Sequence, residues 1–136
     1  MAGLIAADGF DAGIFLGLKA AAPDVSISEA ARIANVHFDL DGEVTRLAGE
    51  LDCNFRVRGR NRDCVLKLTD AAQRLGILQA EAATLLYIAA RNPGLPVPRV
   101  VPAWTGETAL PLLLADGRMI WARMLSFLPG KPLETL

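Results

Sequence analysis

The chain has 136 residues, of which 52% are hydrophobic and 21% charged, and its formal net charge at pH 7 is −1. This length is enough for one domain with a single modest core. A net charge so close to zero argues against a nucleic-acid-binding surface, which is normally strongly basic, and no run of charges indicates a helix that binds a membrane surface.

The cysteines and the histidine argue against a metal site. Cys53 and Cys64 do not form a CxxC pair, and the single histidine, His37, cannot complete a zinc site. A disulfide between the two cysteines and two reduced thiols both stay open, and we favour reduced thiols because we find no secretion signal. The apolar stretches near the N-terminus are too short to span a bilayer. We therefore expect a cytoplasmic protein.

The first third of the chain predicts helix. Residues 1–22 are rich in Ala and Gly and indicate at most a short helix. Ser26 or Ser28 is then expected to cap a helix that ends near Phe38. The segment 39–42 reads DLDG, which resembles the start of a calcium loop, but the remaining ligands are missing and we predict a turn.

The pattern changes to strands after residue 43. Three strands are predicted, over 44–48, 54–58 and 64–69. In the second strand, Phe55 and Val57 alternate with arginines, as expected for a strand that buries one face. The segments 49–53 and 59–63 would connect the strands, the latter as a hairpin. The three strands therefore predict an antiparallel meander.

A principal helix and a second group of strands follow. The helix should begin at Leu75 or Ile77 and run to Ala90, where Asn92-Pro93-Gly94 ends it. Three further strands are predicted, over 99–104 at a sheet edge, 108–114 and 119–127. The last residues, 129–136, are expected to form a linker.

Two charges in this pattern stand among apolar residues. Lys67 interrupts an apolar strand and shares its face with Val65. Glu81 falls within an apolar helical stripe, formed by Leu78, Leu85 and Ile88. Lys67 thus lies on the strand face away from the core. Because an unpaired charge in apolar surroundings is costly, we predict that Glu81 points inward from its helix and pairs with Lys67. The alternative is a lysine that reaches water and a glutamate at the edge of the stripe.

The order of these features resembles the N-terminal lobe of the aminoglycoside phosphotransferase family, and within it the hydroxylysine kinase and choline kinase type, over residues 44–133. The segments that carry the resemblance are Gly49–Phe55, Val65–Leu68, Glu81, Leu95–Arg99 and Leu128–Leu133. The family has a protein-kinase-like fold. The resemblance implies an α+β lobe with an antiparallel sheet of five to six strands, one principal packed helix and extra N-terminal helices.

The resemblance also implies a domain division and a set of nucleotide contacts. Residues 1–42 would be a helical extension, 43–128 the nucleotide-binding lobe and 129–136 a linker. Lys67 would contact the α- and β-phosphates of ATP, and Glu81 would hold Lys67 in place. A loop from Gly49 to Asn54 would cover the nucleotide, although it lacks the several glycines of a protein-kinase loop. The adenine would be contacted by three residues, namely the Val65 side chain and the backbones of Ser126 and Leu128.

The family's catalytic base and metal-binding carboxylates lie in a second, helical lobe. The 136 residues contain no His-Gly-Asp motif, and their single Asp-x-Asp sequence, at 39–41, precedes the predicted sheet instead of following it in a second lobe, so we assign no catalytic or metal-binding residue here. We expect the ATP-binding half of a kinase that uses Mg²⁺ and phosphorylates a hydroxyl group of an amine or amino-alcohol. Alone, the chain should be inactive, and it should contact its substrate through the second lobe. The isolated piece could also self-associate.

Two other functions stay open. In some relatives that the chain resembles, a kinase-like region precedes a class III aminotransferase that uses pyridoxal phosphate (PLP). The chain would then be a regulatory or assembly domain of a bifunctional protein. Alternatively, it is a stand-alone binding module that takes no nucleotide.

Overall fold

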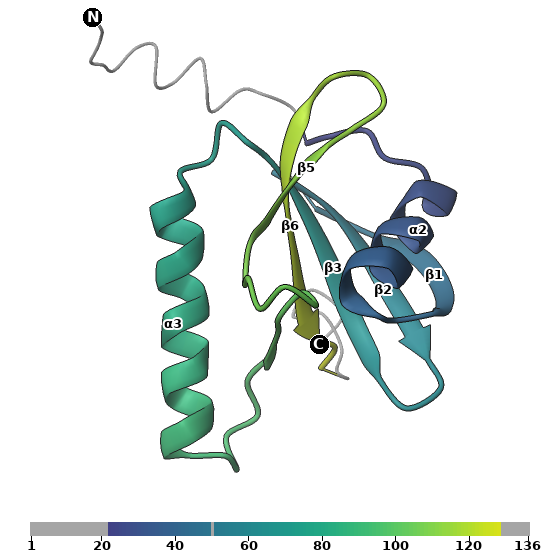
Figure 1. Cartoon of the computed structure of the whole chain (residues 1–136). Helices are drawn as coiled ribbons and strands as arrows, with labels where there is room; N and C mark the ends of the chain where they lie inside the picture. Colours follow the sequence, from purple (N-terminus) through teal and green to yellow (C-terminus); the bar gives the residue numbers. More distant parts are fainter. Residues whose placement is uncertain (1–21, 50, 129–136) are drawn as a thin grey trace, which may run out of the picture.

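The computed structural model of the chain describes residues 22–49 and 51–128 (Figure 1). The short helix expected before residue 22 and the linker expected over 129–136 lie outside these residues. None of the described helices is long and apolar enough to cross a membrane.

The described residues form a six-stranded antiparallel sheet and two helices. The elements in chain order are α2 (Ile27–Phe38), β1 (Gly42–Leu47), β2 (Asp52–Gly59), β3 (Asp63–Asp70), α3 (Leu75–Arg91), β4 (Val100–Val101), β5 (Leu110–Leu113) and β6 (Met119–Ser126). The strand order is β1-β2-β3-β6-β4, and β5 also pairs with β6. The predicted α+β class, the meander and the principal helix are therefore confirmed.

Helix α2 begins and ends at residues with typical helix-capping geometry. Ser26 has an extended backbone, and its side-chain oxygen accepts a hydrogen bond from the Glu29 amide at 3.1 Å. This is the N-cap arrangement that satisfies one of the free amides of a first helical turn. Asp39 ends the helix in the left-handed region, with φ of 53°. Of the two serines considered from the sequence, Ser26 is the cap.

The sheet has one closed and one charged face. On the closed face, alternate residues of β2, β3 and β6 are fully buried and form one core with α2. The core includes Phe55, Val57, Leu66, Leu68, Ile120 and Met124 of the sheet and Ile33, Ala34 and Phe38 of α2. The intervening residues point to the opposite face, because side chains alternate along a strand. That face carries Lys67, which lies on β3 between β2 and β6.

Helix α3 contacts the molecule more sparsely than α2. Only Leu78 and Ala82 are buried among its residues. They do not belong to the core that α2 shares with the sheet. Figure 1 shows α3 standing along one side of the sheet, well apart from α2. The positions of the two helices leave the charged face between the sheet and α3.

Candidate functional site

The charged face is organised as rows of side chains across three strands. In the antiparallel register, Lys67 on β3 lies opposite Asn54 on β2 and Arg123 on β6. In the next row, Thr69 lies opposite Asp52 on β2. Directly opposite residues in a sheet share a face and have closely spaced side chains. The register thus brings together residues that are far apart in the sequence.

These residues form a chain of alternating charges. Asp52 Oδ2 lies 3.4 Å from Lys67 Nζ and 3.5 Å from Arg123 Nη2, so one carboxylate oxygen faces two cations. Thr69 Oγ1 donates to the other oxygen, Asp52 Oδ1, at 2.9 Å. Arg123 Nη1 then donates to Glu81 Oε1 at 2.9 Å, which links the sheet to α3. The order of charges is Lys67, Asp52, Arg123, Glu81.

The predicted ion pair between Lys67 and Glu81 is wrong in this structure. Lys67 pairs with Asp52 and Glu81 pairs with Arg123. The physical reason is the register of β6, which places a second cation directly opposite Lys67 and nearer to α3. Glu81 also does not point inward, because its side chain is 59% exposed. The alternative of a glutamate at the edge of the stripe describes it better.

Sequence reasoning missed Asp52 and Arg123. Arg123 interrupts the apolar strand Ile120–Leu125 just as Lys67 interrupts its own strand, so the same signal could have found it. Asp52 was assigned to a loop, and its position on β2 depends on where the strand begins. Their pairing could not be predicted, because it depends on the register between strands.

The two cations of this cluster are largely buried, so removing them from water costs free energy. The Arg123 side chain is 10% exposed and the Lys67 side chain 25% exposed. Among the described residues, Arg123 Nε and Asn54 Oδ1 are buried atoms without a hydrogen-bond partner. Buried polar atoms are nearly always paired, so an unpaired donor and an unpaired acceptor in the row of Lys67 are exceptions to this rule.

The connection between β1 and β2 approaches this row through its backbone. A Cβ atom on Gly49 would lie 2.5 Å from the Asp52 carbonyl oxygen and 2.6 Å from Asn54 Nδ2. No side chain fits there without a shift. Asn54 Nδ2 also donates to the Ala48 carbonyl at 3.3 Å. The predicted loop is therefore held against the start of β2, and the strand begins at Asp52 rather than after Cys53.

The predicted adenine contacts lie on β3 and at the end of β6. Val65 shares the charged face and lies opposite Leu125. The Ser126 amide donates to the Arg99 carbonyl at 2.8 Å, so this N–H already has a partner in the protein. Leu128 is exposed at the end of the described chain. As adenine contacts, the three residues stay predictions.

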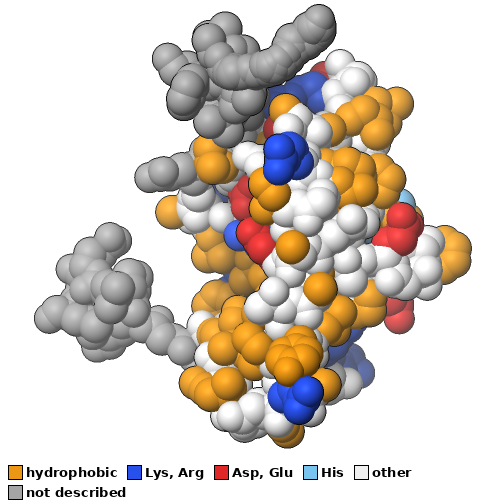
Figure 2. Space-filling view, turned by 90° about the vertical axis from the view of Figure 1, so that its left-hand side faces the viewer, with side chains coloured by type: hydrophobic (Ala, Val, Ile, Leu, Met, Phe, Trp, Pro, Cys, Tyr) orange, Lys and Arg blue, Asp and Glu red, His pale blue; other side chains and the backbone are white. Residues whose placement is uncertain are grey.

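A mainly apolar groove of about 510 Å³ follows α3. It is lined by Ile77, Ala80, Glu81, Thr84 and Leu85. Lys67 is not among its lining residues, so the groove is not the space beside the lysine. Figure 2 views the molecule from the side on which α3 lies in Figure 1 and shows hydrophobic side chains spread among polar ones. No cluster of three or more acidic, histidine or cysteine side chains within residues 22–49 and 51–128 could hold a metal ion.

Comparisons with known proteins bear on the fold. No family model and no curated protein matches the chain. Solved structures do match. An amicoumacin kinase in complex with AMP-PNP and Ca²⁺ is 15% identical at a TM-score of 0.62, and a spectinomycin phosphotransferase in complex with ADP and spectinomycin is 10% identical at 0.59. A microcompartment-associated aminopropanol kinase is 16% identical at 0.59.

The fold is that of a kinase-like small lobe. Each match covers 80% of this chain but only 33%, 31% and 34% of the other chain. The kinase-like lobe thus spans about a third of the length of these phosphotransferases. The likeness confirms the fold expected from the sequence.

Proposed function

We propose that this kinase-like lobe is the ATP-binding part of a small-molecule phosphotransferase, and that Lys67 contacts the phosphates. One observation carries the proposal, namely a partly exposed ammonium group on β3, held by Asp52 on the face opposite the core. Such a cation can bind phosphate oxygens, and phosphoryl transfer depends mainly on positioning and electrostatic stabilisation.

The surrounding residues fit a nucleotide. Gly49 packs so closely against Asp52 and Asn54 that no side chain fits there, which keeps the proposed phosphate-covering loop beside the row of Lys67. Arg123 on β6 adds a second cation directly opposite Lys67. Mg²⁺ would neutralise phosphate charge when bound, and we propose that a second lobe supplies its ligands. Val65, Ser126 and Leu128 stay proposals for the adenine end.

We propose a hydroxyl group of an amine or amino-alcohol as the acceptor. The support is that the solved structures with this fold include an aminopropanol kinase and a spectinomycin phosphotransferase. The acceptor would be bound largely by the second lobe, and the chain alone would be inactive. We also place the protein in the cytoplasm, where ATP is available and where the buried Cys53 and Cys64 would stay thiols.

The test is Lys67→Ala in the full-length protein that contains this chain. We expect ATP-dependent phosphorylation of amino-alcohols to fall about a hundredfold or more, because one preorganised cation at the phosphates is lost. Arg58→Ala is the matched control, since Arg58 is an exposed cation on the same face of β2. The melting temperature should stay within a few degrees in both variants.

Retained turnover in Lys67→Ala would contradict the role of Lys67. A full-length protein without any ATP-dependent turnover would overturn the phosphotransferase assignment. That result would favour a regulatory or assembly domain instead.

A further inference from the structure

We propose that Asp52 is the positioning residue of Lys67, and that α3 acts on Lys67 through Arg123 and Asp52 rather than through a direct glutamate–lysine pair. The effect on nucleotide rests on the proposed function. The coupling among the four side chains does not, and it can be tested separately.

The orientation of the Asp52 carboxylate is set by a neighbouring strand, independently of the two cations. Thr69 is fully buried and lies opposite Asp52 in the register of β2 and β3. Its hydroxyl donates to Asp52 Oδ1 at 2.9 Å. The second oxygen, Oδ2, is thereby aimed at Lys67 Nζ at 3.4 Å. A carboxylate on a strand, with its orientation set by a buried hydroxyl, is a more rigid support than a long side chain on a sparsely packed helix.

Asp52 is the counter-charge of Arg123 as well as of Lys67. The Arg123 side chain is only 10% exposed and needs counter-charge, which Asp52 provides at Nη2 and Glu81 at Nη1. Lys67 and Arg123 face the same oxygen, Asp52 Oδ2. Asp52 therefore holds Lys67 most firmly when Glu81 neutralises part of the charge of Arg123. If Glu81 withdraws, Arg123 turns wholly to Asp52 and weakens its hold on Lys67.

Because of this order of charges, the position of α3 affects how firmly Lys67 is held, although α3 does not pair with Lys67 itself. Moving α3 away removes Glu81 from Arg123 and so loosens Lys67, although Glu81 and Lys67 form no ion pair with each other in the structure. In a direct pair, the effect of Glu81 on Lys67 would not require Asp52. This difference separates the two arrangements in a double-mutant cycle.

The first experiment measures the coupling in the chain itself. Reductive ¹³C-methylation labels its three lysines, Lys19, Lys67 and Lys131, and Lys67→Arg assigns the Lys67 signal. Glu81→Gln should shift the Lys67 methyl signal in the wild-type background and leave it unshifted in the Asp52→Asn background. Equal shifts in both backgrounds, or no shift in either, would overturn the proposal. A shift in the wild-type background only supports it.

The second experiment measures turnover in the full-length protein. Asp52→Asn should lower kcat/KM for ATP roughly tenfold to a hundredfold, because a misplacement of about 1 Å in a positioned group can cost about that much. Asp52→Glu should recover part of the loss, since it keeps the charge. Asp63→Asn is the control, because it breaks a 2.6 Å pair with Arg56 on the same face without touching Lys67.

The two proposals fail in distinguishable ways. If Lys67→Ala keeps full turnover, the proposed function fails, while the methyl-signal cycle still decides the coupling. If Lys67→Ala is inactive and Asp52→Asn turns over like the Asp63→Asn control, the positioning role fails alone. Loss of folding in Asp52→Asn would appear in its amide spectrum. In that case turnover is measured instead in Asp52→Glu and in Glu81→Gln, whose side chain is exposed.

Discussion

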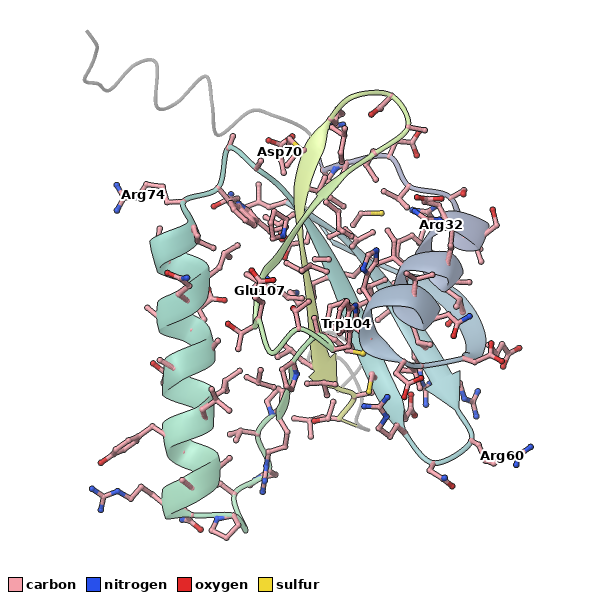
Figure 3. All side chains as sticks on the ribbon, in the orientation of Figure 1. Arg32, Arg60, Asp70, Arg74, Trp104 and Glu107 are labelled. Carbon is pink, nitrogen blue, oxygen red and sulfur yellow. The ribbon has the colours of Figure 1, made fainter. Side chains whose placement is uncertain are left out.

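Asp70 joins the end of β3 to two neighbouring segments. Its Oδ1 accepts a hydrogen bond from the Ala72 amide at 2.8 Å, and its other oxygen pairs with Arg118, which precedes β6. The Ala72 amide, and after it the Arg118 guanidinium, holds the pKa of Asp70 below its ordinary value of 3.8. Figure 3 labels Asp70 at the end of the sheet from which α3 departs.

This lowered pKa predicts a pH-dependent contribution to stability. A carboxyl group with a lowered folded-state pKa stabilises the protein above its unfolded-state pKa, and the contribution is lost as pH falls through the folded-state pKa. Asp70→Asn should therefore lower the free energy of unfolding by about 1 kcal/mol at neutral pH, with solvent screening at the partly exposed Arg118 limiting the value. The deficit should shrink in acid.

Urea unfolding at neutral pH and at about pH 3 checks this, since most carboxylates with an ordinary pKa are protonated there. Asp24→Asn, at an exposed aspartate, provides the comparison. A deficit for Asp70→Asn that is equally large at both values would show that the charge of Asp70 does not stabilise the fold.

Part of the site could be predicted from single residues. Alternation along a strand placed Lys67 on the face away from the core, and that is where it lies. The partner of Lys67 could not be predicted, because it depends on contacts between strands more than 50 residues apart in the sequence, such as Lys67 and Arg123. Helical spacing also did not predict that Glu81 lies outside the buried stripe, since α3 buries only Leu78 and Ala82.

At the scale of elements, α2 depends on its N-terminal cap. Ser26→Ala should lower the free energy of unfolding by about 1 kcal/mol, because the Glu29 amide loses its acceptor in the first turn. Chemical denaturation followed by circular dichroism measures the loss. Ser28→Ala is the matched variant, since Ser28 contacts Ser26 Oγ at 3.2 Å and is not the cap. A larger loss for Ser28→Ala would reverse the assignment.

The strands show which elements the sequence predicts well. The long strands β2, β3 and β6 match their predicted ranges to within two residues at each end, because each alternates strongly. The strand expected over 99–104 contains only Val100 and Val101. Pro98 and Pro102 flank these two residues, and proline has no amide to donate to a neighbouring strand. The proline signal thus indicated an edge position correctly, while the predicted length was wrong.

At the scale of the whole molecule, the two sides of the sheet differ in how completely they are covered. The α2 side is a closed core, whereas α3 leaves apolar side chains exposed, among them Ile77, Leu86 and Tyr87. We propose that the isolated chain self-associates through the part of α3 that carries Leu86 and Tyr87, because neighbouring exposed apolar residues mark interaction surfaces.

The expected result is a concentration-dependent increase in sedimentation coefficient. Leu86→Gln combined with Tyr87→Gln should weaken the association roughly tenfold or more, as expected for the loss of an aromatic contact residue in an interface. Leu113→Gln is the control, since Leu113 is also an exposed leucine but belongs to β5. A chain that sediments as a monomer at high concentration would contradict the proposal.

The burial of both cysteines makes the chain suited to site-selective labelling. Cys53 and Cys64 are only 6% and 2% exposed, and burial raises the pKa of the Cys64 thiol, so that thiol reacts poorly with maleimides. Arg60 stands at the tip of the hairpin between β2 and β3, away from α3 (Figure 3). A cysteine introduced there could carry a single fluorophore without replacing either native cysteine. Energy transfer from that dye to a labelled nucleotide would then test the proposed binding of a nucleotide at the charged face.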